Sequence, residues 1–353
     1  MKKHIVFHLD PLDDSRDMVS LRMHYYAAFA AALSSAGWAC DFMGLETHAA
    51  RAAAAGCYRR VIGVPPVAAS WSWYGQYHLL AHNNALAEEL TATMDDLYRR
   101  MAPDADILLT NTPSTLLRRR YPQSLVLHYE YGIFSRRPFP CLHQLDPWGY
   151  SHKSLLSRYP ALGLPCTEAH RHRLQALRTL VHHQADIDPA QIGRRDSIHV
   201  PLQSERNWPI RLDAQLRRRD IVEQVLRLNP TSEVVVTEKA GHGLDEVDRA
   251  AITSNGRVTL VSGDQGLASG SFYTAYCRAT CTTSPSLALQ TVLWRNTLMA
   301  PANASMFLWM MADRDRALDQ LASYLGNFSV LEVQDLQRVI SNAWLMHSTY
   351  GTL

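Results

Sequence analysis

Near the middle of the 353 residues stands a run that changes character along its length, His199-Val200-Pro201-Leu202-Gln203-Ser204-Glu205-Arg206-Asn207-Trp208. It opens as an apolar segment of strand length and then becomes polar, before a helical pattern begins at Leu212. In open α/β sheets, ligands collect where strands end and the chain turns toward a helix. We therefore expect a strand that ends in a binding site, with an ordinary strand-to-helix loop as the alternative.

Strand-like and helical patterns alternate along the rest of the chain, which predicts an α/β fold. Before residue 190 the predicted strands are 4–9, 38–43, 60–64, 106–110 and 124–128, and the predicted helices are 18–35, 76–101 and 167–184. After residue 190 the predicted strands are 197–202, 233–237, 258–261 and 279–283, and the predicted helices are 212–228, 270–278 and 286–294, followed by a mostly helical tail, 311–350.

The length predicts two domains, because a single hydrophobic core stops growing at about 250 to 300 residues. The segment 187–196 is typical of a connection between domains. We expect an N-terminal Rossmann-like domain over residues 1–190 and a C-terminal Rossmann-like domain with terminal helices over residues 191–353.

Composition and missing motifs exclude several classes of protein. A net charge of +2 is too mild to indicate a nucleic-acid partner. No glycine-rich dinucleotide fingerprint, P-loop or GxSxG motif occurs, which argues against a dehydrogenase, a P-loop NTPase and an α/β-hydrolase. The six cysteines show no CxxC spacing, so we expect free thiols and no metal site.

The location expected from the sequence is the cytoplasm. No export signal is visible, and no apolar run approaches the roughly 18 residues that span a bilayer. The arginine clusters 118–120 and 217–219 would suit anionic headgroups at the inner face of the cytoplasmic membrane, or they are solvated helix faces. Peripheral membrane contact is therefore an open alternative.

Four separated segments together resemble the bacterial retaining β-Kdo glycosyltransferases of capsule and O-antigen polysaccharide biosynthesis. They are Glu130-x-Gly132 with Leu145-Asp146-x-x-Gly149, Val200-Pro201-Leu202-Gln203, Lys239-Ala240-Gly241-His242, and the Ser/Thr-rich turn Thr283-Ser284-Pro285-Ser286. The resemblance covers about residues 130–301. It implies a GT-B-like fold and transfer of Kdo from CMP-Kdo to a saccharide or glycolipid acceptor, with retention through a covalent intermediate and without a metal or other cofactor.

The donor-binding residues that this resemblance implies are Gln203, Lys239, His242, Ser284 and Ser286. Ser284 and Ser286 precede a predicted helix, where free N–H groups attract a phosphate, although plain helix capping explains them equally well. His242 lies between glycines after a predicted strand and Lys239 adds a nearby cation, which suits a phosphate or an acidic sugar. A surface-loop histidine is the alternative.

Two carboxylates of the first half have competing interpretations. Glu130 ends a predicted strand beside Gly132 and is placed to act as a general acid or base, whereas many such residues are merely solvated. Asp146 precedes Pro147, and a role in starting a turn is favoured over a chemical role.

One departure from the family pattern concerns the nucleophile. The position where the resemblance implies a nucleophilic Asp holds Asn207, and a neutral amide does not readily form a glycosyl ester. Either the register shifts and Glu205 supplies the carboxylate, or the chain is an inactivated form, natural or engineered. The prolines of the family's "K-P-H-P" segment are also missing. Three alternatives stay open: a catalytically silent nucleotide-sugar-binding module of a polysaccharide-assembly complex, a CMP-sialic acid transferase, and a sugar-nucleotide epimerase.

Overall fold

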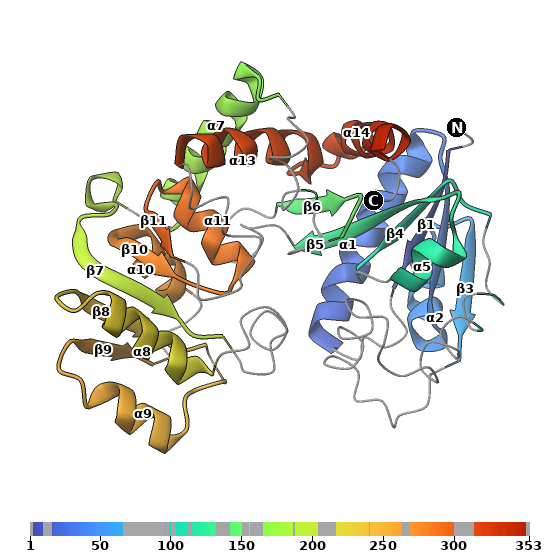
Figure 1. Cartoon of the computed structure of the whole chain (residues 1–353). Coiled ribbons are helices and arrows are strands. Elements are labelled where there is room, and N and C mark those ends of the chain that lie inside the picture. The colour runs from blue at the N-terminus through green and yellow to red at the C-terminus, as the bar shows by residue number, and fades with distance from the viewer. Residues whose placement is uncertain are drawn as a thin grey trace. The chain divides into compact units, whose positions relative to one another are not determined.

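The structure is a computed structural model of the whole chain. It describes residues 3–9, 16–65, 104–111, 115–131, 142–149, 165–185, 188–203, 217–239, 241–262, 268–299 and 314–350, together with Asp96, Arg99 and Leu155. The chain divides into two compact units, the first made of residues 1–130, 143–155 and 327–353 and the second of residues 131–142 and 156–326. The elements of each unit are labelled in Figure 1.

The first unit is built around a seven-stranded sheet. Its strands are β1 (His4–His8), β2 (Ala39–Leu45), β3 (Arg60–Val64), β4 (Ile107–Thr110), β5 (Leu125–Tyr131), β6 (His143–Asp146) and β12 (Ser329–Val330). Their order is β12-β6-β5-β4-β1-β2-β3. The pairs β1–β2, β2–β3, β1–β4 and β4–β5 are parallel, and β12 joins β6 in antiparallel fashion.

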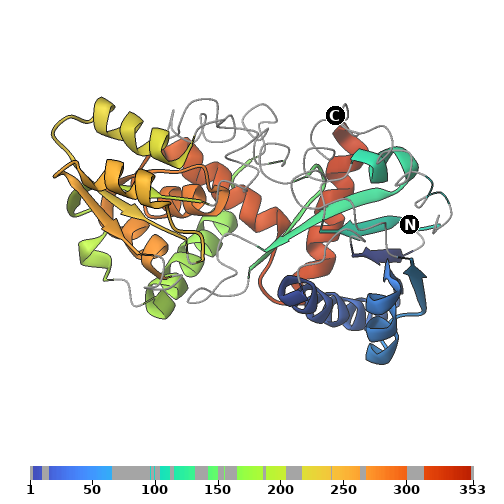
Figure 2. The same ribbon diagram turned by 90° about the horizontal axis from the view of Figure 1, so that it is seen from below.

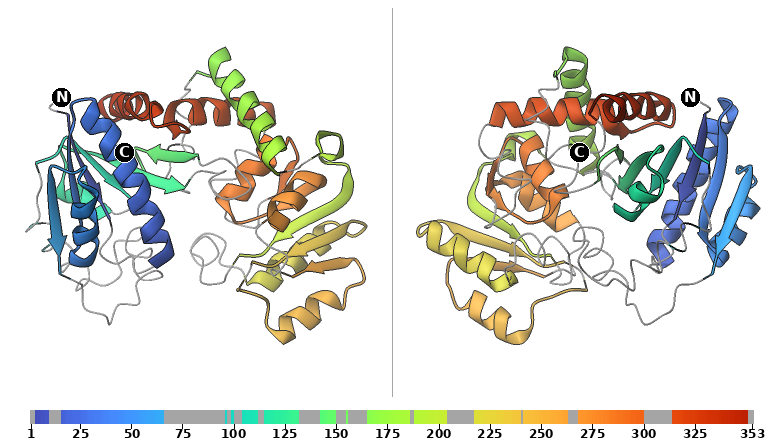
Figure 3. Two further views of the ribbon diagram at one scale, coloured as in Figure 1. Left: turned by 180° about the vertical axis from the view of Figure 1, so that it is seen from behind. Right: turned by 45° about the vertical axis from the view of Figure 1, so that its right-hand side comes forward.

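The helices of this unit are α1 (Arg16–Ser35), α2 (Glu46–Ala55), α5 (Thr115–Arg120) and α14 (Asp335–Tyr350). α1 and α2 contact each other and the sheet, and α1 lies across the strands in the view from behind in Figure 3. α14 turns its apolar side chains Leu336, Val339, Ile340, Ala343 and Met346 into the core and contacts β6 and β12. The C-terminal helix therefore completes the core of the first unit.

The second unit holds a five-stranded sheet of parallel strands, β7 (Arg195–Pro201), β8 (Glu233–Thr237), β9 (Val258–Val261), β10 (Cys277–Cys281) and β11 (Thr297–Met299). Its order is β11-β10-β7-β8-β9. The remaining elements are α7 (Glu168–Ala185), the short 3₁₀ helix η2 (Pro189–Gln191), α8 (Arg218–Leu228), α9 (Glu246–Thr253), α10 (Ala268–Tyr276), α11 (Pro285–Leu293) and α13 (Arg314–Phe328). α8 packs with α9 and α10 packs with α11 (Figure 2).

In both sheets the first strand along the chain is an inner strand. The next two strands lie on one side of it, and the later strands lie on its other side. That is the strand order of Rossmann folds. The predicted fold class, two Rossmann-like α/β domains with C-terminal helices, is confirmed. The units place α7 with the second sheet and α14 with the first, whereas the sequence analysis puts α7 in the first domain and α14 in the second. The predicted boundary between residues 190 and 191 stays a prediction.

Most predicted elements are present at nearly the predicted bounds, and the exceptions are instructive. The helix α10 ends at Tyr276, and β10 begins at Cys277, two residues before the predicted strand, because Cys277 already pairs with Arg195 of β7. The predicted helix 76–101 lies outside the described residues, except for Asp96 and Arg99, which are helical. The sequence analysis missed α2, α5, α9, β6, β11 and β12.

Candidate functional site

The order of the second sheet reverses between β7 and β10, and this reversal locates the candidate site. β8 and β9 lie on one side of β7, and β10 and β11 on the other. Connections leave in opposite directions at such a point and open a crevice at the carboxyl ends of the strands. Three loops meet this edge: the one after β7, the one after β8 and the one between β10 and α11.

The end of β7 carries the first part of the central run. Leu202 is buried and its N–H donates to the Thr237 carbonyl at 2.8 Å, which continues the sheet by one residue. Gln203 follows and is partly exposed at the carboxyl edge. The predicted catalytic residues Glu205 and Asn207 lie outside the described residues, so their roles stay predictions.

A tight turn follows β8 and carries two of the predicted donor-binding residues. The His242 N–H donates to the Lys239 carbonyl at 2.9 Å, and the two residues form an isolated antiparallel bridge. Gly241 has φ of 72°, a conformation that side chains with a Cβ adopt at a cost, which explains the glycine at this place. Lys239 is partly exposed and His242 is exposed.

The loop between β10 and α11 holds Ser284 at the N-cap position, with extended backbone and Pro285 directly after it. The Ser284 side chain makes no cap hydrogen bond, and its N–H donates to Thr282 Oγ1 at 2.9 Å. Ser284 thus occupies the N-cap position without a capping hydrogen bond from its hydroxyl, and the donor-binding role of Ser284 and Ser286 stays a prediction. Ser286 lies in the first turn of α11, and its side chain is outside the description. The first-turn N–H groups of α11 begin at the edge where β10 ends.

Beneath this edge, a histidine in the middle of β7 links three elements. His199 is fully buried; its Nδ1 lies 3.1 Å from Thr274 Oγ1 of α10 and its Nε2 lies 2.9 Å from Thr237 Oγ1 of β8. Burial lowers the pKa of His199 to about 3. This imidazole is thus neutral and structural, and it fixes the ends of β7 and β8 relative to α10.

In the first unit, the two candidate carboxylates belong to neighbouring strands, β5 and β6. Glu130 is the sixth residue of β5, and its side chain is outside the description. Asp146 ends β6, is 2% exposed and accepts from the N–H groups of Trp148 at 2.8 Å, Gly149 at 3.2 Å and Leu155 at 2.8 Å. Asp146 organises a turn, as the favoured interpretation predicts, and Gly149 has φ of 139° within it.

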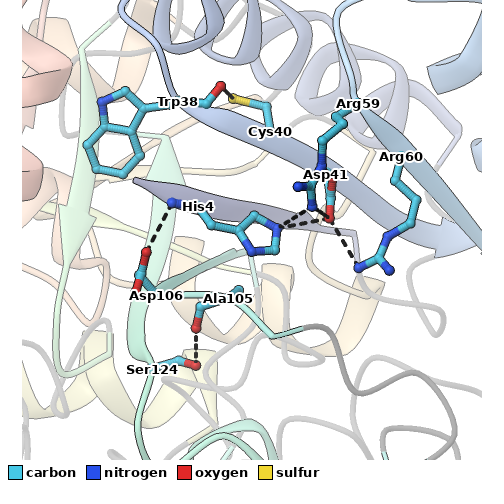
Figure 4. Close-up of polar contacts among 9 residues, drawn as sticks. All are labelled: His4, Trp38, Cys40, Asp41, Arg59, Arg60, Ala105, Asp106 and Ser124. Atoms are coloured by element: carbon cyan, nitrogen blue, oxygen red, sulfur yellow. Dashed lines mark hydrogen bonds and ion pairs between the residues drawn. The ribbon is translucent and has the colours of Figure 1, made fainter. Parts of the chain in front are cut away.

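A second charged cluster lies at the opposite, amino edge of the first sheet (Figure 4). The buried carboxylate of Asp41 accepts from Arg59 Nη2 at 2.9 Å and lies 3.1 Å from Arg60 Nη2 and 2.8 Å from His4 Nε2. Burial raises the pKa of Asp41, but the hydrogen bonds from Arg59 and His4 outweigh it and hold the pKa below its ordinary value. These contacts join the starts of β1, β2 and β3 and are structural.

The arginines of the two clusters differ in burial and in contacts, and Arg217 is exposed. Arg218 is buried and donates to carbonyls of the turn after β8. Its neighbour Arg219 pairs with Glu223, and Arg118 donates to the Pro147 carbonyl at 3.3 Å. Membrane contact stays a prediction. No helix in the described ranges is long and apolar enough to cross a membrane.

The described part of the chain contains no cluster of three or more His, Cys, Asp or Glu side chains suited to a metal ion. The cysteines it includes are free thiols, as predicted: Cys40, Cys57, Cys166, Cys277 and Cys281.

The structure brings several of the predicted residues to one edge of the second sheet. Those that follow neighbouring strands of the second sheet are Gln203, Lys239, His242, Ser284 and Ser286. Glu130 belongs to the sheet of the first unit. Sequence reasoning missed Arg218, Glu238 and Arg249, which hold the turn after β8. Nothing in the sequence marks Arg218 and Arg249, because the helices that carry them reach the turn only in the folded chain. Glu238 directly follows β8, and its contact with Arg249 of α9 is likewise a tertiary one.

Comparisons with known proteins found similar solved structures at low identity. No family model matches the chain, and no curated protein does. Among solved structures it is similar to a β-Kdo 2,7-transferase, KpsC, of Thermosulfurimonas dismutans, with 13% identity, 74% of this chain and 89% of that chain covered, and a TM-score of 0.44. A glycosyltransferase from Rickettsia africae matches at 8% identity over 99% of both chains, with a TM-score of 0.38.

A UDP-GlcNAc 2-epimerase from Neisseria meningitidis matches at 10% identity over 97% of this chain and 99% of that chain, again with a TM-score of 0.38. At these identities and TM-scores the likeness concerns the general fold and does not extend to donor, acceptor or reaction.

Proposed function

We propose that the protein is a glycosyltransferase that moves Kdo from CMP-Kdo to a saccharide or glycolipid acceptor of cell-surface polysaccharide. The observation that supports this most is the convergence at one sheet edge of three loops: the end of β7 with Gln203, the Lys239–His242 turn after β8, and the start of α11. They flank the reversal in strand order, where Rossmann-like sheets bind nucleotides.

The chemistry of this edge suits a donor with one phosphate. A nucleoside monophosphate sugar carries a single phosphodiester charge, which Lys239, His242 and the α11 N-terminus would meet without a metal ion. Since α11 starts with Pro285, its first free N–H groups belong to the residues that follow. This binding arrangement needs no glycine-rich pyrophosphate loop, in accord with the absence of that motif.

The reaction implied by the family resemblance has two steps. A carboxylate oxygen attacks the anomeric carbon as the bond to the CMP phosphate breaks, which leaves a glycosyl ester; an acceptor hydroxyl then attacks that carbon, gives its proton to a base and releases the carboxylate. Glu130 is the proposed base. Asn207 stands at the nucleophile position, so the chain with Asn207 should bind the donor without turning it over unless Glu205 acts in its place.

A second candidate follows from Asn207 itself. A chain with an amide where the carboxylate is required would serve as a catalytically silent nucleotide-sugar-binding module of a polysaccharide-assembly complex. It shares the donor site with the enzyme and differs only in turnover.

One experiment separates these functions from each other. CMP binding is measured by titration calorimetry, and CMP or UDP release is followed with CMP-Kdo, CMP-sialic acid or UDP-GlcNAc as donor. The parent and Asn207→Asp proteins are both assayed, and release of CMP from CMP-Kdo alone by Asn207→Asp supports the Kdo transferase. CMP binding without any release by either protein supports the silent module, and preferential use of CMP-sialic acid or UDP-GlcNAc supports the other two alternatives. Failure to bind CMP or any of the three donors would overturn the proposal.

A further inference from the structure

The turn after β8, which the structure describes at residue 239 and residues 241–244, is held by two charged side chains, Arg218 and Glu238. Arg218 Nη1 donates to the carbonyls of His242 at 2.7 Å and of Gly243 at 3.1 Å. Arg218 begins α8 and is 9% exposed, so both contacts are shielded from water. A hydrogen bond from a charged donor in such a place is among the stronger ones in proteins.

The second support of the turn is the carboxylate of Glu238, whose side chain is 2% exposed. Its Oε1 accepts from the Leu244 N–H at 2.7 Å and from Arg249 Nη2 at 3.0 Å, and its Oε2 lies 3.1 Å from the same Arg249 nitrogen. Leu244 itself is buried in the core beneath the sheet. The end of the turn is therefore tied to both a charge pair and the core.

The contact of the His242 carbonyl with Arg218 also fixes the direction of the Gly243 N–H. A trans peptide unit is planar, with the carbonyl and the following N–H pointing in opposite directions. Because Arg218 draws the His242 carbonyl toward α8, the Gly243 N–H points away from α8. Gly243 is exposed, and its N–H finds no acceptor in the part of the chain that the structure describes.

Gly243 also has little room for a side chain. A Cβ at this position would lie 3.4 Å from Arg249 Nη2 and 3.5 Å from Glu238 Oε1. Glycine lets the backbone pass close to this charge pair, and it leaves the outward side of the peptide uncovered.

We propose that Arg218 and Glu238 are positioning residues of the donor site, and that they aim the Gly243 N–H, together with His242 and Lys239, at the donor phosphate. This inference rests on the proposed function and adds a backbone donor and its two supports to it. Backbone N–H groups held in this way bind phosphate without changing charge, and they are placed before the ligand arrives.

The direct test follows the Gly243 amide by NMR in protein labelled with ¹⁵N-glycine, with the resonance assigned by its loss in Gly243→Ala. CMP is added in one titration and cytidine, which lacks the phosphate, in another. We expect CMP to shift the Gly243 resonance downfield and cytidine to leave it in place. An unmoved Gly243 resonance in protein that binds CMP would overturn the inference and leave the proposed donor intact.

The supports are tested with substitutions that keep charge or size. In Arg218→Lys a single ammonium replaces the forked group that spans two carbonyls, and we expect about tenfold weaker CMP binding with unchanged cytidine binding. Glu238→Gln should act in the same direction, because the amide keeps the Leu244 contact only in one orientation and loses the charge pair with Arg249. Arg219→Lys is the matched control, since Arg219 is the neighbour on α8 and pairs with Glu223 at the surface.

Thermal unfolding of each variant shows whether a loss of CMP affinity comes from a loss of stability. A fall in CMP affinity with equal loss of cytidine affinity would reduce Arg218 and Glu238 to general supports of the fold and would overturn their positioning role. Should Arg218→Lys prove unstable, the Gly243 shift in the parent and in Glu238→Gln decides the question. If the parent binds neither CMP nor cytidine, the proposed function fails, and this inference fails with it.

Discussion

A neutral, buried histidine occurs in the first strand of each sheet. His8 ends β1 and lies 2.9 Å from Thr110 Oγ1 of β4, and His199 in β7 contacts Thr237 and Thr274. Burial lowers the pKa of each to about 3. Both residues therefore stand next to the point where the strand order reverses, and both must stay unprotonated for the core to hold.

These histidines predict a loss of stability in mild acid. Their pKa in the folded chain lies below the ordinary value near 6.5, so the unfolded state takes up the proton first; their stabilisation is complete above about pH 6.5 and declines as the pH falls toward 3. At about pH 5 each of the two histidines should lower the free energy of unfolding by about 2 kcal/mol relative to neutral pH. Urea unfolding at about pH 7.5 and about pH 5 measures this loss, and His199→Gln should remove one histidine's share of it. The exposed His172→Gln is the control; an unchanged pH dependence in His199→Gln would show that this histidine is not buried in its neutral form.

His242 gives the second prediction at this scale. The His242→Ala protein should bind CMP more weakly by about 1 to 3 kcal/mol, the loss expected for a hydrogen bond to a charged group. Titration calorimetry with CMP measures it, and His172→Ala on α7 serves as a control far along the chain. Equal affinity in parent and His242→Ala would remove His242 from the donor site.

At the scale of elements, the turn after β6 depends on one side chain. Asp146 accepts three backbone N–H groups, so Asp146→Asn sets an amide N–H₂ against at least one of these donors. We expect a loss of about 1 to 3 kcal/mol in stability with CMP binding unchanged. Thermal unfolding and CMP titration are compared with Glu233→Gln, an exposed carboxylate at the start of β8. Full stability together with lost turnover in an active form would instead make Asp146 part of the chemistry.

Elements whose formation depends on their own residues are the ones that the sequence predicts. β8 and β9 have the predicted bounds, because both consist mainly of β-branched and other apolar residues, which favour strands. β6 has the sequence His-Gln-Leu-Asp, whose polar residues do not indicate a buried strand, and it was missed. Its His143 is buried with its Nδ1 2.9 Å from the Tyr129 hydroxyl, a contact that exists only in the folded chain. The helix α2 could have been found from its run of alanines, its early Glu46 and the left-handed Gly56 that ends it.

The residues of the candidate site also divide into those that local sequence indicates and those that only tertiary contacts place. Positions such as Gln203, Lys239 and His242 were predicted because they follow strands, and strand ends can be read from the sequence. Arg218 was interpreted as part of a surface cluster, because its contact with the turn after β8 joins residues 24 and 25 positions apart on different elements. Tertiary contacts of this kind leave no local pattern.

At the scale of the whole molecule, the two units have separate cores. α14 completes the core of the first unit, and α8 packs in the core of the second. Ile340→Ala on α14 and Ile221→Ala on α8 make the same change in buried helical positions, and each should cost about 2 to 5 kcal/mol. Hydrogen exchange should show lost protection in β5 and β6 for Ile340→Ala and in β7 and β8 for Ile221→Ala. Equal loss in both units with either variant would mean that the chain unfolds as a single cooperative body.

We propose that the chain is built to transfer Kdo from a CMP donor, and that the residue at position 207 decides whether it does. The most direct measurement is intact mass, with parallel detection of CMP, after the parent, Asn207→Asp and Glu205→Gln proteins are each incubated with CMP-Kdo. A carboxylate at residue 207 can attack the anomeric carbon and an amide cannot. We predict a gain of one Kdo on Asn207→Asp with release of CMP, and neither on the parent. CMP release by the parent that Glu205→Gln abolishes, or no gain in mass and no CMP from Asn207→Asp, would contradict the account.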